Sequence, residues 1–453
     1  MLLRKKHFIP DLHLLAYCVL GILFLLAIAS RVSLFNVETN DYTFFIGPWY
    51  DFIQTHGGFA ALKYNFSNYN VPYLYLLALT TYLPIPKLDA IKTISVVFDG
   101  VLGIFTYLIL SLKYRRSYAA IIGALVVISA PTIFINGAVW GQCDAIYTAF
   151  CLGSLYFLLK ERPAWACIFF GLAISFKLQA IFFLPVFLML LLKRKLAIKH
   201  LVLIPLIFLL MLVPAFIAGR DAWSLLTIYA GQVNTGGVGS PGQFNGGGAG
   251  QFNDRGPRQF NGRGPGQFNG GGPGQFKGGG LGGGNFSSSS LTLNAPSFYQ
   301  WLPTSAPAYW KWVGILLAGL VVALVGALLV ASKQRLTSAI FLKVTLVFAL
   351  AIPFLLPEMH ERYFYLADVV SIIYAFYFPR YFYIAIIMQL CSLLSYAPYL
   401  IHTQVVNLAY VAIGVLVITV ITLADLVLTL YPNISLPYSL HLYRHKDPMN
   451  KHQ

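Results

Sequence analysis

The sequence predicts an all-α protein that crosses a membrane many times, and three observations support this fold class. Of the 453 residues, 58% are hydrophobic and only 10% are charged, whereas a soluble domain carries roughly 25% charged residues. Apolar runs of about 20 residues, the length of a membrane-spanning helix, recur along the chain. The basic residues gather in short loops between these runs, as the positive-inside rule expects of cytoplasmic loops.

The net charge of +16 does not indicate a nucleic-acid-binding protein. The basic residues are spread over separate loops and form no single face. The five cysteines are scattered without metal-ligand spacing, and they predict no disulfide. We therefore expect membrane lipids, and no nucleic acid, around this chain.

The first apolar run follows the basic start MLLRKKH and has no evident small-residue cleavage site. It predicts a retained first helix that leaves the cytoplasm. Twelve spanning helices are predicted in all, near 11–30, 91–112, 118–137, 143–159, 164–177, 180–193, 200–218, 311–331, 337–356, 363–378, 381–397 and 405–430.

Residues 71–86 are bounded by prolines and are short for a crossing, which predicts an interfacial or re-entrant segment. A full crossing here would invert the side of every basic loop that follows. Without it, all of these loops fall on the cytoplasmic side, namely 113–117, 160–163, 193–200, 332–335, 379–380 and 443–446. The sequence thus predicts a multi-pass protein of the cytoplasmic (plasma) membrane with both termini in the cytoplasm.

Four polar stretches then share the outer side. They are the first loop (31–72), WGQCD (140–144), FKLQ (176–179) and PEMHERYFY (357–365). Because the parity of the spans places them together, we expect one active site on the outer face.

Residues 234–290 have a different character. The dipeptide Gln-Phe recurs with a strict period of eight in a segment dominated by glycine and proline. No apolar face is available to form a core, so we expect a disordered, extracytoplasmic insertion rather than a solenoid. It separates an N-terminal membrane bundle (1–233) from a C-terminal one (291–453).

The first loop supplies the candidate base. Asp41 follows the first helix near the membrane surface, where a carboxylate can accept a proton while a lipid-borne donor is presented from the bilayer. The alternative is a solvated acid or a helix cap, and Glu38 and Asp51 of the same loop fit that alternative better.

The second and third stretches supply candidate substrate-binding residues. Trp140, Gln142 and Asp144 lie at the outer start of a helix, where Asp144 has the alternative of capping the N-terminus. Lys177, with Gln179 beside it, lies at or near membrane depth. Ionisable groups there are costly and often functional, although Lys177 has the alternative of snorkelling to the surface.

The fourth stretch concentrates His360, Glu361 and Arg362 at the outer end of a helix pair. Arginine and histidine there can bind the phosphate of a lipid carrier and stabilise the leaving group, and the alternative is a structural ion pair. Asp99 is a further intramembrane acid that either partners Lys177 or lines the acceptor path. Asp425, near the inner end of the last helix, is expected to be structural.

No glycine-rich nucleotide loop lies between a strand and a helix, and no His/Cys metal cluster occurs. The energy for a transfer must therefore come from elsewhere. A lipid-linked activated donor suits an external site without nucleotides.

Together the four polar stretches and GLAISFKLQAIFFLP resemble the bacterial relatives of GPI mannosyltransferase II. These belong to the GT-C superfamily of polyprenyl-phosphate-sugar-dependent glycosyltransferases. The resemblance covers nearly the whole chain except the insertion. It implies a GT-C-like bundle whose first extracytoplasmic loop carries juxtamembrane helices. It also matches Asp41 to the superfamily's acidic base, and His360, Glu361 and Arg362 to its late-loop motif.

The sequence is thus interpreted as an integral membrane hexosyltransferase of the cell envelope. It is expected to move a hexose, with mannose named by the resemblance, from a polyprenyl-phosphate donor to an extracytoplasmic glycan, lipid or protein acceptor, with inversion. No cofactor is expected, and a metal ion is neither required nor excluded. The alternative is a lipid or solute transporter or flippase. A transporter site lies at the midplane between repeated halves, whereas no helix repeat is evident here and the polar motifs crowd one side.

Overall fold

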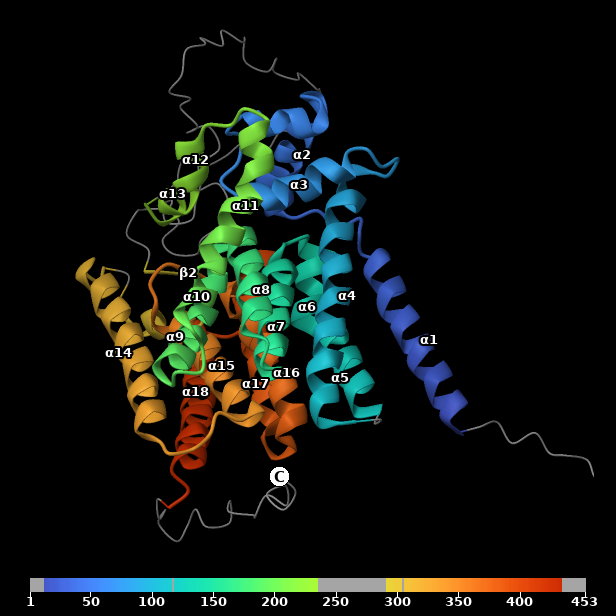
Figure 1. Ribbon diagram of the computed structural model, residues 1–453. Helices are drawn as coiled ribbons and strands as arrows, with labels where there is room; N and C mark the ends of the chain where they lie inside the picture. Colours follow the sequence, from blue (N-terminus) through green and yellow to red (C-terminus); the bar gives the residue numbers. More distant parts are fainter. Residues whose placement is uncertain (1–11, 116–117, 235–290, 304, 434–453) are drawn as a thin grey trace, which may run out of the picture.

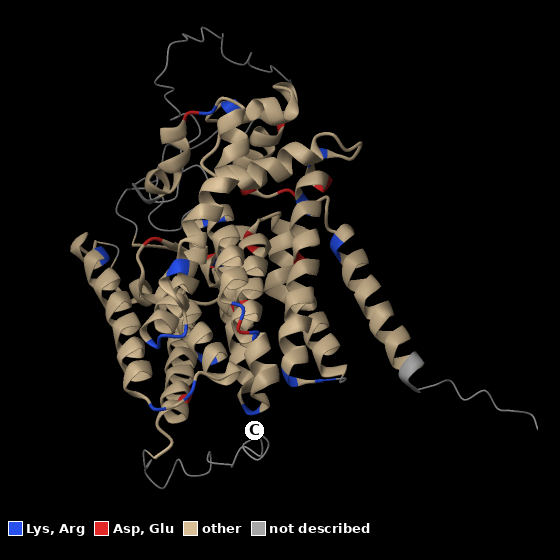
Figure 2. Ribbon diagram, in the orientation of Figure 1, with Lys and Arg blue, Asp and Glu red and all other residues tan. Residues whose placement is uncertain are grey.

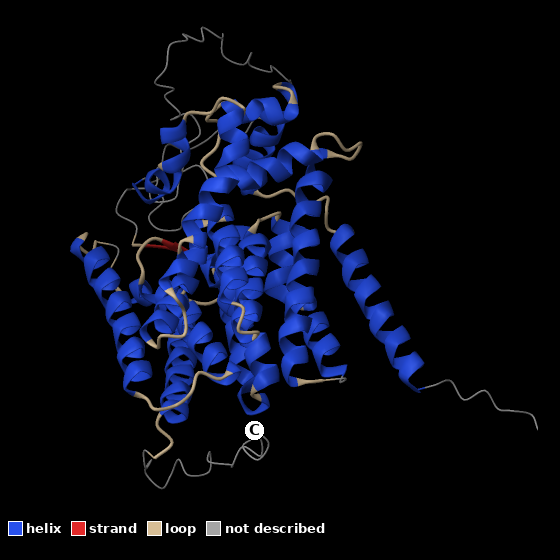
Figure 3. Cartoon of the chain, viewed as in Figure 1, coloured by secondary structure: helices blue, strands red, loops and turns tan. Residues whose placement is uncertain are grey.

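The protein is a bundle of helices in which strands are almost absent. The computed structural model describes residues 12–115, 118–234, 291–303 and 305–433. Most of the described residues are helical (Figure 3), which confirms the predicted all-α, polytopic class. All but the first residue of the predicted insertion (234–290) and the whole basic tail (443–446) lie outside the described residues.

The helices of the N-terminal half are α1 (Leu12–Val32), α2 (Gly47–Thr55), α3 (Val71–Thr80), α4 (Lys87–Lys113), α5 (Tyr118–Ser129), α6 (Pro131–Phe134), α7 (Asp144–Leu159), α8 (Pro163–Phe176), α9 (Leu184–Leu192), α10 (Ile198–Leu201), α11 (Leu203–Ile217), α12 (Ala222–Leu226) and α13 (Ile228–Asn234). Those of the C-terminal half are α14 (Tyr309–Ala331), α15 (Ser338–Leu355), α16 (Tyr365–Tyr377), α17 (Phe382–Leu400) and α18 (Leu408–Leu430). Shorter helical turns cover Tyr42–Ile46, Gly58–Lys63, Ile135–Trp140, Leu178–Phe183, Phe298–Trp301, Glu361–Phe364 and Pro379–Tyr381. Two short parallel strands, β1 (Thr292–Leu293) and β2 (Met359–His360), complete the description.

Each predicted span coincides with helix, but the spans differ in length. Seven helical segments of the described chain are long and apolar enough to cross a membrane, or eight if one bent pair counts as a single span. The remaining four predicted spans are the shorter helices α7, α8 and α16 and the segment Leu178–Leu192. Whether these four complete the predicted twelve crossings stays a prediction.

The bend within the third predicted span has a local cause. Pro131 opens α6, and a proline disfavours helical geometry in the residue before it. Ala130 is accordingly extended, with φ −61° and ψ 134°. The helices on the two sides of this break meet at 50°.

One end of the bundle carries a cap of short helices, α2, α3, α12 and α13 (Figure 1). Within it α3 has 10 residues, too few for a crossing, and lies across the end of the bundle (Figure 1). The Asn70 side chain accepts a hydrogen bond from the backbone N–H of Val71 at the start of α3. The Tyr75 hydroxyl then ties α3 to α11 by donating to Met211 O at 2.9 Å.

The opposite end carries basic loops. The turns after α4, α14 and α16 lie there, with many of the Lys and Arg residues (Figure 2). The described chain also begins α1 and ends α18 at this end (Figure 1). For these three loops the arrangement agrees with the predicted grouping, and their side of the membrane stays a prediction.

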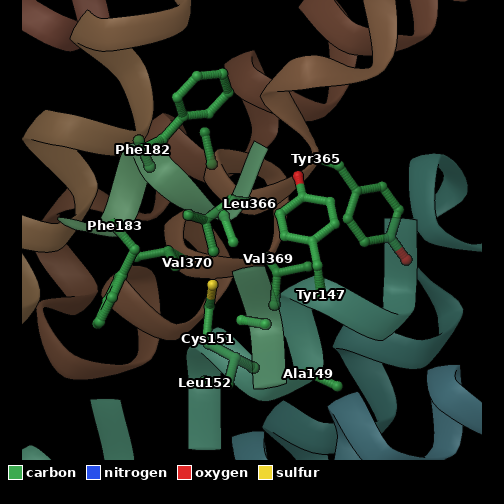
Figure 4. Close-up of a cluster of buried hydrophobic side chains, with 14 of the residues drawn as sticks. Tyr147, Ala149, Cys151, Leu152, Phe182, Phe183, Tyr365, Leu366, Val369 and Val370 are labelled. Atoms are coloured by element: carbon green, nitrogen blue, oxygen red, sulfur yellow. The ribbon is translucent and has the colours of Figure 1, made fainter. Parts of the chain in front are cut away.

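The core lies where α7, α16 and the turn Leu178–Phe183 meet. Figure 4 shows Tyr147 and Cys151 of α7 beside Leu366 and Val370 of α16. These four side chains are fully or almost fully buried. This packing fixes the ends of α7 and α16, and the polar residues described next lie at those ends.

Candidate functional site

Asp41 lies at the start of the helical turn that follows α1. Its side chain makes no capping hydrogen bond, so the alternative of a helix cap does not describe it. One carboxylate oxygen accepts hydrogen bonds from Trp140 Nε1 at 2.9 Å and from Gln142 Nε2. The Asp41 side chain remains 16% exposed. The structure therefore joins the first loop to the second predicted stretch at a carboxylate that solvent can reach.

Neighbouring residues position Trp140 and Gln142, the two residues that donate hydrogen bonds to Asp41. Gly141 adopts φ +72° between them, a left-handed conformation that glycine takes without strain. The Trp140 ring stacks on Tyr399 with centroids 4.7 Å apart. Ser95 Oγ donates to the Gln142 carbonyl at 2.6 Å. This support orients the two side chains before any ligand arrives.

Asp144 begins α7, but its carboxylate does not cap the helix. One oxygen pairs with Lys177 Nζ at 2.5 Å, and the other accepts from Asn136 Nδ2 at 2.9 Å. The Asp144 side chain is fully buried. The capping alternative is therefore wrong for this side chain.

Lys177 lies at the break where α8 ends. Its backbone is extended, with φ −153° and ψ 136°, and its side chain turns inward to Asp144. The residue is buried, so the snorkelling alternative is wrong. The ammonium also lies over the Tyr69 ring, 5.9 Å from the centroid.

Arg362 connects the groups around Asp41 and Asp144. Its Nη1 lies 3.7 Å from an Asp41 oxygen, and its Nε lies 3.9 Å from an Asp144 oxygen. Nη1 also donates to Glu361 Oε1 at 3.2 Å, and the guanidinium lies over Trp140, 5.3 Å from the ring centroid. Arg362 thus stands among three carboxyl groups, and its Nε has no hydrogen-bond acceptor.

Two residues beside Arg362 in the sequence, His360 and Glu361, have shifted pKa values. Burial raises the pKa of Glu361 to about 7, although Arg362 opposes this shift. Burial, with the positive charges of Arg362 and Lys177, holds the pKa of His360 well below its usual value. His360 is therefore neutral near pH 7, and a neutral imidazole can donate and accept hydrogen bonds.

Two predicted residues stand at the edge of this group. Gln179 lies in the turn after Lys177, and its buried Oε1 has no hydrogen-bond partner. His360 belongs to β2, whose pairing with Leu293 of β1 sets its position. No direct contact joins either side chain to Asp41 or Asp144 among the described interactions.

Among the other acids, Asp99 has a different partner from the one considered from the sequence. Asp99 pairs with Arg31 at 3.0 Å, not with Lys177, and both side chains are buried. Asp51 pairs with Lys87 at 2.8 Å near the surface, and Glu38 is exposed. Asp425 accepts from Tyr381 at 2.8 Å and pairs with Lys343 at 2.6 Å, as a structural acid would.

Asn136, Tyr399 and Arg31 were not singled out from the sequence. Asn136 is a polar residue within an apolar run, a signal that could have indicated a buried partner for an ion. Arg31 ends the first apolar run, where an arginine also suits the membrane surface. Tyr399 gives no distinguishing signal, because tyrosines are frequent throughout the chain.

No group of three or more His, Cys, Asp or Glu side chains suitable for a metal ion occurs in the described part of the chain. The site instead pairs carboxylates with an arginine and a lysine. This arrangement can bind a polar ligand, and it offers Asp41 as a proton acceptor.

Comparison with known proteins gives the class. A family model described as Glycosyltransferase family 87 matches residues 66–242. A search of the curated proteins found no match. The matched segment contains Trp140, Gln142, Asp144, Lys177 and Gln179, and ends before His360, Glu361 and Arg362. With the helices that are long and apolar enough to span a membrane, this similarity supports the class of membrane glycosyltransferases.

Proposed function

We propose that the protein transfers a hexose from a polyprenyl-phosphate donor to an acceptor hydroxyl on the outer face of the bacterial cytoplasmic membrane, with inversion. One observation carries this proposal. The partly exposed Asp41 carboxylate is oriented by Trp140 and Gln142, and it lies 3.7 Å from Arg362. A positioned proton acceptor thus stands beside a cation at the end of the bundle that carries the cap.

In the proposed step the acceptor O–H gives its proton to Asp41 as its oxygen attacks the anomeric carbon. The bond between that carbon and the phosphate oxygen breaks. The electron pair leaves with the phosphate, which departs as polyprenyl phosphate. Attack on the face opposite to the leaving group inverts the anomeric centre.

Arg362 is the proposed contact of the donor phosphate, because its Nε is buried without an acceptor and a guanidinium suits phosphate oxygens. Lys177 reaches the same place but is neutralised by Asp144. We assign Lys177 and Asp144, with Gln142, Trp140 and Gln179, to binding of the sugar. His360 is assigned as a neutral hydrogen-bonding group, and Glu361 as the partner that orients Arg362.

Mannose remains the first sugar to test, since it is the sugar named by the resemblance to GPI mannosyltransferase II relatives. The acceptor is a hydroxyl of a glycan, lipid or protein outside the cytoplasm. The chemistry needs no metal, because the phosphate leaves already ionised.

The substitution Asp41→Asn tests the proposal. It preserves size and hydrogen bonding but removes the proton acceptor, so turnover should fall about 10²–10⁴-fold. Donor affinity should persist, because the proposed phosphate contact is Arg362. The measurement is transfer from a synthetic polyprenyl-phosphate hexose, with donor binding measured separately.

Glu38→Gln and Asp51→Asn are the matched controls from the same loop, and both should keep near-normal turnover. An Asp41→Asn enzyme with normal turnover would remove Asp41 from the mechanism and direct attention to Asp144.

A further inference from the structure

Arg220 is a buried cation in the turn between α11 and α12, and it is not among the residues assigned above. The residue is only 2% exposed. Its Nη2 donates to Asn65 Oδ1, whereas Nε and Nη1 have no acceptor. Two guanidinium nitrogens are thus buried without a hydrogen bond, which normally costs about 1–3 kcal/mol or more for a charged group.

The charge of Arg220 also lacks a counter-charge. No carboxylate of the described chain forms an ion pair with it. The adjacent Asp221 is engaged elsewhere, since its side chain accepts from Ser224 N at 2.7 Å. Burial lowers the pKa of Arg220 to about 10, opposed only by Tyr75. Arg31, which is equally buried, has Asp99 at 3.0 Å.

Water can satisfy the two free N–H groups but brings no charge. A phosphate group supplies both negative charge and several acceptor oxygens, and it matches the forked donors of a guanidinium. Asn65, which accepts the hydrogen bond from the Arg220 guanidinium, is itself exposed to solvent. Displacing the Asn65 amide would let an anion take its place.

The surroundings favour a phosphate that is attached to a lipid. The two helices that meet at Arg220, α11 and α12, enclose an apolar groove of about 180 Å³, lined by Leu209, Leu212, Val213, Phe216, Ala222, Leu225 and Leu226. Lys63 adds a second cation nearby, since a Cβ built on Gly219 would lie 3.8 Å from the Lys63 Cβ. Arg220 lies in the chain between the α11 and α12 residues that line the groove, so a lipid whose chain occupied the groove could present its phosphate to Arg220.

This place is close to the proposed transfer site. Asn65 is four residues before Tyr69, so their Cα atoms are at most about 14 Å apart. The Tyr69 hydroxyl donates to Gln142 at 3.3 Å, and its ring lies under Lys177. The contacts of Asn65 and Tyr69 therefore link the neighbourhood of Arg220 to that of Gln142 and Lys177.

We propose that Arg220 binds the phosphate group of a ligand at the cap, next to the groove between α11 and α12. The assignment of a polyprenyl phosphate as that ligand rests on the proposed function, whereas the phosphate site itself does not. Arg220 would bind the phosphate of the lipid-linked ligand either before that phosphate reaches Arg362 or at a position next to Arg362.

The experiment measures thermal unfolding of the full chain in nanodiscs of phosphatidylcholine. The added probes are polyprenyl monophosphate, phosphatidylglycerol, inorganic phosphate and, as the uncharged control, polyprenol. A probe that binds the folded state raises its unfolding temperature, by about 2–4 °C or more at saturation. We expect this rise with polyprenyl monophosphate and no rise with polyprenol.

Arg220→Met should lower the affinity for polyprenyl monophosphate about ten- to hundredfold, so the rise at a fixed probe concentration should be clearly smaller than in the wild type. Arg220→Lys keeps the charge without the fork and should give a smaller rise. Without any probe, Arg220→Met should unfold at or above the wild-type temperature, because it removes an unpaired buried charge. Arg31→Met is the matched control and should unfold earlier, because it leaves Asp99 unpaired.

An equal rise with inorganic phosphate would support the phosphate site and identify free phosphate as its ligand, and a rise with phosphatidylglycerol alone would identify a membrane phospholipid. No rise of the wild type with any probe, or the same rise in Arg220→Met, would overturn the inference. The rise in unfolding temperature reports phosphate binding and not transfer, so the Asp41→Asn variant should show the same rise as the wild type. If Asp41→Asn lost transfer in the turnover assay, but the rise in unfolding temperature did not depend on Arg220, only this inference would be contradicted. The proposed function would then stand.

Discussion

Arg362 has the largest number of charged neighbours in the proposed site. Arg362→Ala would leave Asp41, Asp144 and Glu361 without the guanidinium that lies 3.2–3.9 Å from each. Donor affinity should fall about ten- to hundredfold, since a charged hydrogen bond contributes about 1.5–3 kcal/mol. Transfer should slow as well, because the leaving phosphate loses the same partner.

The measurements are donor binding and kcat/KM with the synthetic donor. Arg335→Ala, in an exposed loop at the opposite end of the bundle, is the control and should match the wild type. If Arg362→Ala bound the donor normally, the phosphate would have to be assigned to another cation.

The raised pKa of Glu361 predicts how the free energy of unfolding changes with pH. Its folded-state pKa of about 7 stands above the usual glutamate value of about 4.3. Between these pH values the folded state keeps a proton that the unfolded state has lost, so Glu361 lowers stability as pH rises. Glu361→Gln removes this titration and should gain about 3 kcal/mol relative to wild type between pH 4 and pH 8.

Chemical denaturation in detergent at several pH values checks this expectation. Glu161→Gln, in the exposed turn after α7, should follow the wild-type profile. Parallel profiles for Glu361→Gln and wild type would show that Glu361 titrates normally in the folded protein.

At the scale of elements, the contact between α14 and α15 depends on one glycine. A Cβ on Gly314 would overlap the Tyr299 hydroxyl and the Leu355 carbonyl oxygen. Gly314→Ala should therefore destabilise the protein by about 1–3 kcal/mol through overpacking. Gly319 lies on the same helix with nothing within 4 Å of its Cβ position, so Gly319→Ala should be neutral or stabilising by about 0.5–1 kcal/mol. Thermal unfolding of the pair measures the difference, and equal effects would show that α14 and α15 do not pack in this way.

The sequence could predict which polar residues share one side of the membrane, but it could not predict which helix faces pack together. The span parity placed the regions of Asp41, Asp144, Lys177 and Arg362 on one side, and the structure brings these four residues together. The partner of Asp99 could not be predicted, because hydropathy does not show which helix faces meet. Likewise, the alternatives for Asp144 and Lys177 depended on whether the two side chains turn toward each other, which only packing decides.

At the scale of the whole molecule, the two ends of the bundle should differ in accessibility. Thr55, on α2 of the cap, and Lys160, after α7, are both exposed. In a Cys18→Ser background the other four cysteines are buried, so a new cysteine can be labelled selectively. An impermeant reagent added to intact cells should label Thr55→Cys and leave Lys160→Cys unlabelled until the cells are opened. The reverse pattern would place the proposed site in the cytoplasm.

The attachment of α1 has a consequence for how the chain is made. This helix is mostly exposed to its surroundings, with 11% of its span buried, yet Arg31 at its end pairs with Asp99, 68 residues later. It also donates to Ile128 O, 97 residues later. At about 5–20 residues per second, Arg31 waits roughly 3–14 s for Asp99 and longer for Ile128. Helix α1 therefore cannot make these contacts until α4 and α5 have been synthesised, and during that interval the Arg31 guanidinium depends on water and lipid headgroups at the membrane surface.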